Sequence, residues 1–234
     1  MAKTMEKQVE TELKLKLAPG TLPAFLASPL VAGKVLSGSN QVLELVSTYY
    51  DTPSWNLRRA GMAYRVRQTG KTAFEATVKM DKGLVRDGLS ERKEITVPLK
   101  AAQPVVQEFS AVGLELAPVV KQEKLQPLFT VTVERLVKLL QLDKDTVAEL
   151  AVDRGEVRAG QKRLPIDEIE LELKSGSLKT LLTYVLALTE NFSLSAGLQS
   201  KYEQGLILLG QTVRTVKQQD QPVGPALQKL LAAL

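Results

Sequence analysis

The feature that most constrains the fold is the stretch VETELKLKL at residues 9–17, in which charged residues occupy every second position. Glu10, Glu12, Lys14 and Lys16 alternate with four apolar residues and one threonine. Because side chains on a β-strand point alternately to opposite faces, this period predicts a strand with one charged face. A single strand of this kind is typical of an antiparallel sheet that has one face in water.

The same alternation recurs along the 234 residues, which predicts an α+β fold that is mainly β. Further strands are expected at 41–50, 61–68, 72–80, 89–99, 128–142, 146–158 and 164–174, and helices at 22–31, 101–127, 178–191 and 225–234. About eight successive antiparallel strands close readily into a barrel, with the helices packed outside. We expect one domain over residues 1–210 and a tail over 211–234 that carries a short amphipathic helix, with a candidate linker at 218–225.

Composition excludes several classes of chemistry. The chain has no cysteine and no histidine, which excludes disulfides, a Ser-His-Asp triad, a histidine base and a zinc site of the usual kind. Any reaction must use carboxylates, lysine, arginine, hydroxyls or a metal held by oxygen. No apolar run approaches the roughly 20 residues that span a membrane. We therefore expect a cytoplasmic protein without a membrane partner.

The net charge of +5 is unevenly distributed. Residues 58–100 contain 11 Lys/Arg and 5 Asp/Glu, whereas residues 143–174 contain 6 Lys/Arg and 9 Asp/Glu. A basic and an acidic segment in one chain suggest a site that handles an anion and a cation together. A patchy surface without function would give the same numbers.

Two architectures fit the charged faces. In one, the apolar faces form the core and the charged faces meet water. In the other, the sheet closes with its charges inward, and helices cover the apolar faces. Buried charges cost several kcal/mol per ion unless they are paired or bind something, so the second architecture needs phosphates for the bases and metal for the acids. Glu168, Glu170 and Glu172 share one face, and closely spaced carboxylates without histidine favour Mg²⁺ or Mn²⁺.

The motif Glu10-x-Glu12-x-Lys14 matches the ExExK signature of the CYTH family, the triphosphate tunnel metalloenzymes. Other segments resemble that family's blocks in the same order: YYDTP (49–53), LRRAGMAYRVR (57–67), ATVK (76–79), SERKE (90–94), ELAVDRGEV (149–157), IELELKSG (169–176) and SKYEQG (200–205). The resemblance implies an eight-stranded antiparallel closed barrel, a tunnel lined by acids and bases, and metal-dependent hydrolysis or transfer at a triphosphate.

Residue by residue, the resemblance implies three sets of site residues. Substrate-binding residues would be Lys14, Arg65, Arg67, Lys79, Arg92, Arg135 and Lys201. Metal ligands would be Glu10, Glu12, Glu170 and Glu172, together with Glu168 and Asp153. Catalytic residues would be Lys14, Lys201 and Glu170. Two divalent ions, Mg²⁺ or Mn²⁺, would bridge phosphate oxygens and activate a water. The role of Glu94 is left open.

The length, the YYDTP block and the pattern LRR-x-x-M-x-x-R-x-R resemble the bacterial inorganic triphosphatase branch, which predicts hydrolysis of tripolyphosphate. The alternatives are a thiamine triphosphatase, an adenylate cyclase-type activity on nucleoside triphosphates, and a non-catalytic polyphosphate-binding module. The expected partner is a small polyanion and not a nucleic acid, and the protein is expected to be a monomer or homodimer. Arg58 and Arg59 are interpreted as a solvated turn or the tunnel rim, and Trp55 as a packing anchor.

Overall fold

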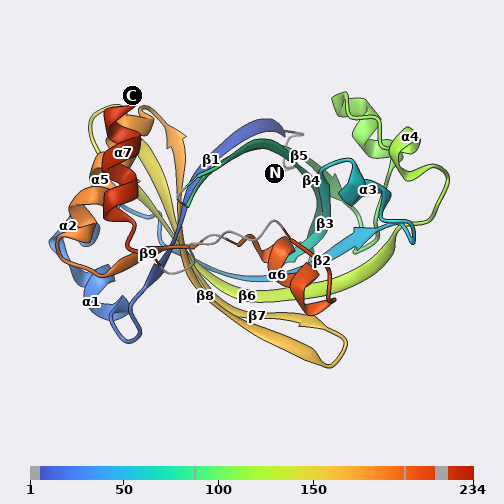
Figure 1. Cartoon of the computed structure of the whole chain (residues 1–234), viewed down its shortest axis with the longest axis horizontal. Coiled ribbons are helices and arrows are strands. Elements are labelled where there is room, and N and C mark those ends of the chain that lie inside the picture. Colours follow the sequence, from blue (N-terminus) through green and yellow to red (C-terminus); the bar gives the residue numbers. More distant parts are fainter. Residues whose placement is uncertain (1–5, 87, 198, 214–220) are drawn as a thin grey trace.

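The computed structural model describes residues 6–86, 88–197, 199–213 and 221–234. Within them, eight antiparallel strands form a closed barrel in the order β5-β4-β3-β2-β6-β7-β8-β1, and the pairing of β1 with β5 closes the ring (Figure 1). The barrel strands are β1 (Glu6–Leu17), β2 (Gln41–Asp51), β3 (Met62–Thr69), β4 (Ala73–Arg86), β5 (Leu89–Leu99), β6 (Gln126–Gln141), β7 (Val147–Ala159) and β8 (Lys162–Ser175). The predicted eight-stranded closed barrel is confirmed.

The side chains of β1 show which of the two architectures the chain adopts. Glu12 and Lys14 line a cavity inside the barrel, whereas Leu13 and Leu15 point outward and are completely buried under helices. On β1 and on most of the other strands, the apolar faces are thus covered from outside and the charged faces surround the interior. On β2 and β6 the inner face also carries an apolar cluster, and Val42 and Val46 on the outer face of β2 are exposed. The strand period alone could not decide this, because both architectures use the same alternation.

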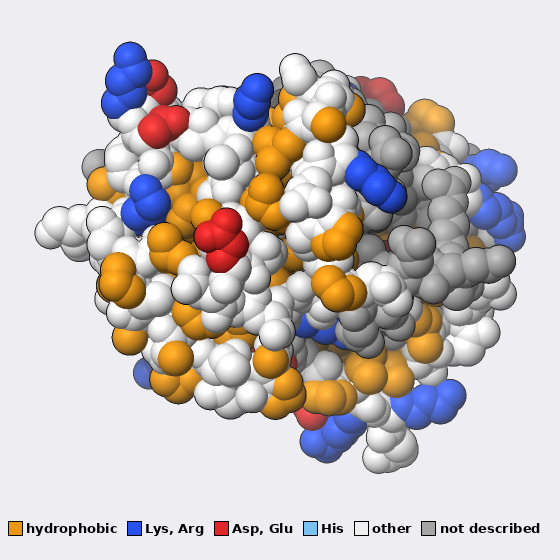
Figure 2. All heavy atoms as spheres, turned by 60° about the vertical axis from the view of Figure 1, so that its left-hand side comes forward, with side chains coloured by type: hydrophobic (Ala, Val, Ile, Leu, Met, Phe, Trp, Pro, Cys, Tyr) orange, Lys and Arg blue, Asp and Glu red, His pale blue; other side chains and the backbone are white. Residues whose placement is uncertain are grey.

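One helical layer covers the outer face of β1, β7 and β8. Its helices are α1 (Leu22–Ala27), α2 (Pro29–Ala32), α5 (Leu178–Thr189) and α7 (Gly224–Ala232). Leu181 and Val185 of α5 and Leu227 of α7 belong to one buried cluster with Leu13 and Leu15. Figure 2 is turned so that this side of the molecule comes forward, and it shows apolar side chains interspersed with charged ones on the surface.

A short strand, β9 (Leu194–Ala196), follows α5 and pairs with the C-terminal end of β1, at residues 15–17. Ser195 forms a bridge with Pro222 immediately before α7. The helix expected at 225–234 is therefore present, as α7, and it packs on the barrel domain's own helices. The boundary at residue 210 stays a prediction, and residues 218–220 of the candidate linker lie outside the described residues.

A second layer covers the outer face of β3, β4 and β5. It consists of α3 (Asn56–Arg59), the 3₁₀ helix η1 (Gln107–Val112) and α4 (Ala117–Val120). The continuous helix expected at 101–127 is wrong: only η1 and α4 are helical there. The backbone turns left-handed at Gly113 and Lys121, with φ of 75° and 53°, directly after each short helix. Pro104 and Pro118 also lack the N–H that a helix interior needs.

The helix α6 (Lys201–Leu208) was not predicted. It lies at one side of the barrel opening, beside β2 and β6 (Figure 1), and Tyr202 packs against an apolar cluster on the inner faces of β2, β6, β7 and β8. A capping box between Ser200 and Glu203 starts the helix. Among the described residues, no helix combines the length and the apolar character that a membrane crossing requires.

Candidate active site

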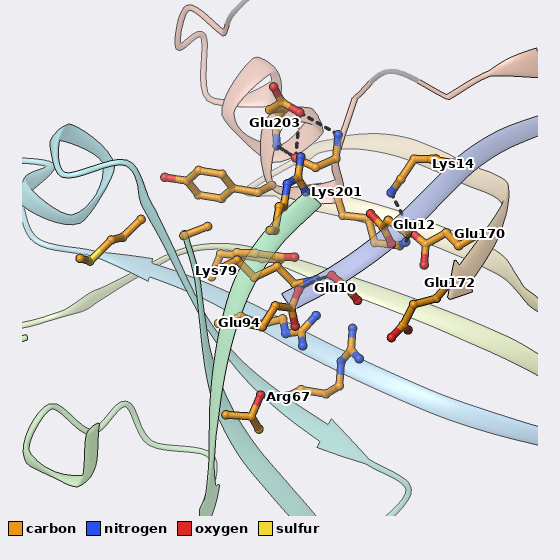
Figure 3. A pocket seen from close by; sticks show the side chains of 18 of the residues that line it. Glu10, Glu12, Lys14, Arg67, Lys79, Glu94, Glu170, Glu172, Lys201 and Glu203 are labelled. Carbon is orange, nitrogen blue, oxygen red and sulfur yellow. Dashed lines mark hydrogen bonds and ion pairs between the residues drawn. The ribbon is translucent and has the colours of Figure 1, made fainter. Parts of the chain in front are cut away.

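A cavity of about 540 Å³ fills the charged part of the barrel interior. Its lining includes eleven of the thirteen residues predicted from the sequence: Glu10, Glu12, Lys14, Arg65, Arg67, Lys79, Arg92, Arg135, Glu170, Glu172 and Lys201. Figure 3 shows the β1 residues of this set facing Glu170 and Glu172 of β8, with Lys201 above them on α6. Asp153 and Glu168 are buried beside this cavity without being part of its lining.

The strand register explains why residues far apart in the chain meet here. Lys14 of β1 lies opposite Glu170 of β8, and Arg135 of β6 lies opposite Asp153 of β7. Residues directly opposite each other in an antiparallel pair have Cβ atoms about 5 Å apart, so their side chains interact. The alternating pattern predicted the shared face of each strand, but only the register fixes these partners.

Six of these side chains form a dense network, which we call the paired cluster: Lys14, Arg135, Asp153, Glu168, Glu170 and Lys201. Lys14 Nζ lies 2.7 Å from Glu170 Oε1 and 3.3 Å from Glu168 Oε1. Lys201 Nζ lies 2.6 Å from Asp153 Oδ2 and 2.9 Å from Glu170 Oε1, and it also contacts Glu168. Three cations therefore face three carboxylates.

Arg135 completes the paired cluster. Its Nε and Nη2 each donate to one oxygen of Asp153 at 2.6 Å, and Nη2 also donates to Glu170 Oε2 at 2.6 Å. Bidentate guanidinium–carboxylate contacts of this kind are among the strongest charge-assisted hydrogen bonds. The arrangement locks the planes of both groups.

The network sets the protonation of its members. Burial alone would raise the pKa of Glu170, but the positive charges of Lys14, Lys201 and Arg135 outweigh it and hold this pKa well below its usual value. Burial likewise opposes the charge on Lys14, yet Glu168 and Glu170 raise its pKa well above the ordinary range. Glu170 is therefore ionised and Lys14 protonated at neutral pH.

Asp153, Glu168 and Glu170 are also the three carboxylates in the described chain whose oxygens lie within 4.8 Å of one another, an arrangement that could hold a metal ion. In the present structure, ammonium and guanidinium groups already contact all three. The predicted roles of Asp153 and Glu168 as metal ligands remain predictions, and these contacts offer a second role for both residues.

A smaller ionic group joins β1, β4 and β5. Lys79 Nζ lies 2.9 Å from Glu10 Oε2 and also contacts Glu94 Oε1 (Figure 3). Burial raises the pKa of Glu10 in spite of the lysine. For Glu94, burial is outweighed by Lys79, so its pKa is lowered. Glu94, whose role the sequence left open, thus lines the cavity as a partner of Lys79.

Three other lining residues, Glu12, Arg65 and Arg67, are named here the open lining. Glu12 accepts a hydrogen bond from Ser90 Oγ at 3.2 Å, Arg65 donates to Thr77 Oγ1 at 3.3 Å, and Arg67 donates to Ser47 Oγ at 3.1 Å. Among the described residues, none of the three takes part in an ion pair. Their hydrogen-bond partners named above are hydroxyl groups, whereas the side chains of the paired cluster contact groups of opposite charge.

The electrostatics of Glu12 and Arg67 follow from this lack of direct ion pairs. Burial raises the pKa of Glu12, and the negative charge of Glu170 adds to the effect. Burial and the positive charges of Arg65 and Arg135 lower the pKa of Arg67. Both shifts show that the charged forms of Glu12 and Arg67 are destabilised in the free protein. A cation beside Glu12 and an anion beside Arg67 would relieve that cost. Arg65 differs, because burial opposes its charge but is outweighed by the neighbouring Tyr49, Glu94, Glu75 and Glu10, which raise its pKa.

Sequence reasoning missed several lining residues. Glu149 of β7 lies opposite Glu172 of β8, which in turn lies opposite Glu12 of β1, so three glutamates form one row across three strands. The shared face of Glu149 and Asp153 was the available signal for this residue. Tyr49 and Tyr202 form an aromatic part of the lining, and their ring centroids are 5.6 Å apart. No local pattern indicated that contact, since it depends on the placement of α6.

Comparisons with known proteins agree with this geometry. Residues 8–202 match the CYTH domain, and the chain belongs to the CYTH family. It is 32% identical over 204 residues to a Haemophilus influenzae protein named inorganic triphosphatase, with 85% of this chain and 54% of that protein aligned. The chain thus spans about half the length of this curated relative.

Solved structures share the fold at low sequence identity. A Hippeastrum protein, proposed to be an adenylyl cyclase and reported to have a dominant triphosphatase activity, aligns with a TM-score of 0.57 at 15% identity, over 88% of this chain and 98% of its own. A Bacillus halodurans protein proposed to be an adenylate cyclase aligns with a TM-score of 0.50 at 17% identity, over 83% of this chain and 95% of its own. These likenesses concern the barrel itself.

Proposed function

We propose that this protein hydrolyses inorganic triphosphate inside the barrel with the help of a divalent metal ion. The observation that carries the proposal is the open lining: Arg65 and the half-buried Arg67, which make no direct ion pair among the described residues, lie in the same cavity as the buried Glu12, which makes none either. A polyanion and a cation bound together would balance both. The Haemophilus influenzae relative, named inorganic triphosphatase, supports the choice of substrate.

The donor set fits a hard divalent cation. The chain contains neither histidine nor cysteine, and burial raises the pKa values of the buried Glu12 and the half-buried Glu10 and Glu172. Oxygen-only ligation is the preference of Mg²⁺ and Mn²⁺. Glu10, Glu12, Glu170 and Glu172 would hold the ion, with Glu149 beside them. When bound, the ion supplies charge neutralisation at the phosphate oxygens and activation of water.

The chain's own residues would bind and orient the substrate. Arg65 and Arg67 are suited to phosphate oxygens, because a guanidinium presents paired donors that match them. Lys79, Arg92 and Arg135 would add positive charge around the triphosphate. In hydrolysis, a water oxygen bonds to the terminal phosphorus, the P–O bond to the bridging oxygen breaks, and orthophosphate and pyrophosphate leave with the water's protons shared between them and solvent.

Lys14 and Lys201 would act by charge and not as bases. Burial opposes a positive charge on each of them, but the carboxylates of the paired cluster outweigh it and raise both pKa values. Two protonated ammonium groups beside the cavity can stabilise the negative charge that develops on the leaving group. Glu170, which stays ionised, would join this cluster to the metal.

Phosphate release from tripolyphosphate, ATP and thiamine triphosphate, each measured with Mg²⁺, Mn²⁺ or EDTA at alkaline pH, tests the proposal. We expect rapid, metal-dependent release from tripolyphosphate and little from the organic substrates. No release from any of them, with tripolyphosphate still raising the melting temperature, would instead identify a polyphosphate-binding module.

One observation supports a second candidate substrate, an organic triphosphate. Tyr49, Met62 and Tyr202 give the cavity an aromatic and apolar section, on which a base or thiazole ring could pack. Faster release from ATP or thiamine triphosphate than from tripolyphosphate would favour that candidate. As part of the same proposal, the protein acts in the cytoplasm on a small polyanion and not on nucleic acid, and it is a monomer or a homodimer.

A further inference from the structure

Arg58 lines the cavity but belongs to neither the paired cluster nor the open lining. Its Nη1 donates to Gln211 Oε1 at 2.7 Å, and its Nη2 donates to the backbone carbonyl of Thr212. Both acceptors are neutral and lie on consecutive residues just after α6. One guanidinium thus joins the rim of the barrel to the C-terminal end of the helix that carries Lys201.

The loop before α3 holds Arg58 firmly in place. Asp51 is completely buried, and its carboxylate accepts hydrogen bonds from the backbone N–H groups of Leu57 at 2.9 Å and Arg58 at 3.0 Å. Trp55 adopts a left-handed backbone conformation with φ of 58°, which is costly for an aromatic residue. Its ring lies 5.6 Å from the Arg58 guanidinium carbon. Such strain persists only where surrounding contacts determine the conformation.

Gln211 and Thr212 report directly on the position of α6. The backbone turns at Gly210, with φ of 74°, and the N–H of Gln211 donates to Leu206 O at 2.9 Å. This pattern closes the last turn of the helix, so Gln211 moves with α6. A cation at this end also suits the partial negative charge of a helix C-terminus.

The helix needs external contacts to keep its place. With eight residues, α6 is far shorter than the roughly 12–15 residues at which isolated helices become marginally stable in water. Its first residue, Lys201, is held by the paired cluster, and the middle residue, Gly205, lies against the ring of Phe129 so closely that a Cβ there would come within 2.2 Å of it. At the far end, Lys162 Nζ donates to Leu208 O at 3.1 Å, and Arg58 holds the two residues Gln211 and Thr212 that follow the last turn.

We propose that Arg58 is a positioning residue, which clamps α6 over the cavity and thereby holds the Lys201 ammonium at the reacting end of the substrate. The catalytic consequence of this assignment rests on the proposed function. The clamp itself does not, and it can be measured without substrate. Arg59, the next residue, is exposed and provides a matched control.

Hydrogen exchange of the segment 201–212 tests the clamp directly. We expect Arg58→Ala to speed exchange of the amides near the end of α6 about tenfold. Arg58→Lys should have an intermediate effect, because a single ammonium lacks the planar pair of donors. Gln211→Ala, which removes one acceptor, should act in the same direction as Arg58→Ala. Exchange in Arg58→Ala that equals exchange in Arg59→Ala would overturn the proposal, whether or not the protein hydrolyses triphosphate.

Kinetic coupling to Lys201 tests the catalytic consequence. We expect Arg58→Ala to lower kcat for tripolyphosphate about tenfold with little change in KM, and to cause no further loss when Lys201 is already glutamine. Residues that act through one another show such non-additivity. An equal loss in both backgrounds, or a change confined to KM, would mean that Arg58 acts on the substrate itself, and the positioning role would be wrong.

Discussion

The paired cluster and the open lining are parts of one barrel interior and contain the same kinds of residues, yet their charges are balanced differently. In the paired cluster, Lys14, Lys201 and Arg135 contact Asp153, Glu168 and Glu170 directly. In the open lining, Glu12, Arg65 and Arg67 have hydroxyl partners. The first region is complete without a ligand, whereas the second leaves the charges of Glu12 and Arg67 for a ligand to neutralise.

This difference bears on how a residue's role should be assigned. A buried ion pair is expensive to break, since the remaining partner loses its compensation. Residues of the paired cluster should therefore affect stability first, and activity through the position of Lys14 and Lys201. Residues of the open lining should affect binding and turnover while costing the fold little.

The largest effect is expected for Glu12→Gln. Removal of one negative charge from the proposed metal site should lower metal-dependent turnover by about 100-fold or more, equivalent to about 2.7 kcal/mol in the barrier. The fold should persist, because burial already disfavours the charge on Glu12. Phosphate release measured across a metal titration checks this, with the exposed Glu134→Gln on β6 as control. Wild-type turnover in Glu12→Gln would show that the metal does not use this carboxylate.

Glu168→Gln probes the other region. The change removes the carboxylate charge that Lys14 and Lys201 share, so we expect the free energy of unfolding to fall by about 2–3 kcal/mol. The metal concentration that gives half-maximal activity should stay the same. Urea denaturation measures the first quantity and the assay above the second.

Glu156→Gln is the matched control on the same β-hairpin, because Glu156 pairs with Arg163 at the surface and should contribute below about 1 kcal/mol. A large shift in metal dependence for Glu168→Gln, with stability unchanged, would place Glu168 among the metal ligands after all.

Arg67→Ala should weaken binding of tripolyphosphate by about 2 kcal/mol, since one charge-assisted contact to phosphate is lost. Isothermal titration calorimetry without metal isolates this contribution. The same substitution should leave stability unchanged or raise it, because the neighbouring cations Arg65 and Arg135 already disfavour the charge on Arg67. Unaltered affinity would mean that the phosphate lies elsewhere in the cavity.

The sequence predicted much of the barrel because its signal is local. Alternation fixed the strands and the shared faces of Glu10, Glu12 and Lys14, and the ordered blocks indicated the CYTH family, which the comparison confirmed. Whether the charged faces point inward could not be read from the period. That choice depends on closure of β1 onto β5, a contact between residues about 80 positions apart.

The ion pairs inside the cavity could not be predicted from the sequence for a similar reason. Lys14, Asp153 and Glu168 were predicted as residues of one site and lie in one network, but their contacts depend on strand register and on the placement of Lys201 by α6. The helix itself was missed, since eight residues show little periodicity. The role of Arg58 depends on a contact with Gln211, 153 positions away.

The smallest expected effect is the pH dependence of stability, in which the two regions oppose each other. Burial raises the pKa of Glu12 above 4.5, so the folded state binds a proton more readily than the unfolded state, and this residue should add stability as the pH falls through its raised pKa. Glu170 has a lowered pKa, because its three cationic partners outweigh burial, so its contribution is present above pH 4.5 and is lost as the pH falls through its folded value.

Urea unfolding in EDTA should therefore give a free energy of unfolding that rises from pH 7 toward mildly acidic pH and then falls at lower pH. Glu12→Gln should reduce the rise, to which Glu10 and Glu172 also contribute through their raised pKa values, and leave the acidic fall, whereas Glu134→Gln should leave the profile unchanged. A profile in Glu12→Gln identical to that of the wild type would show that the open lining is compensated in solution, and the contrast with the paired cluster would fail.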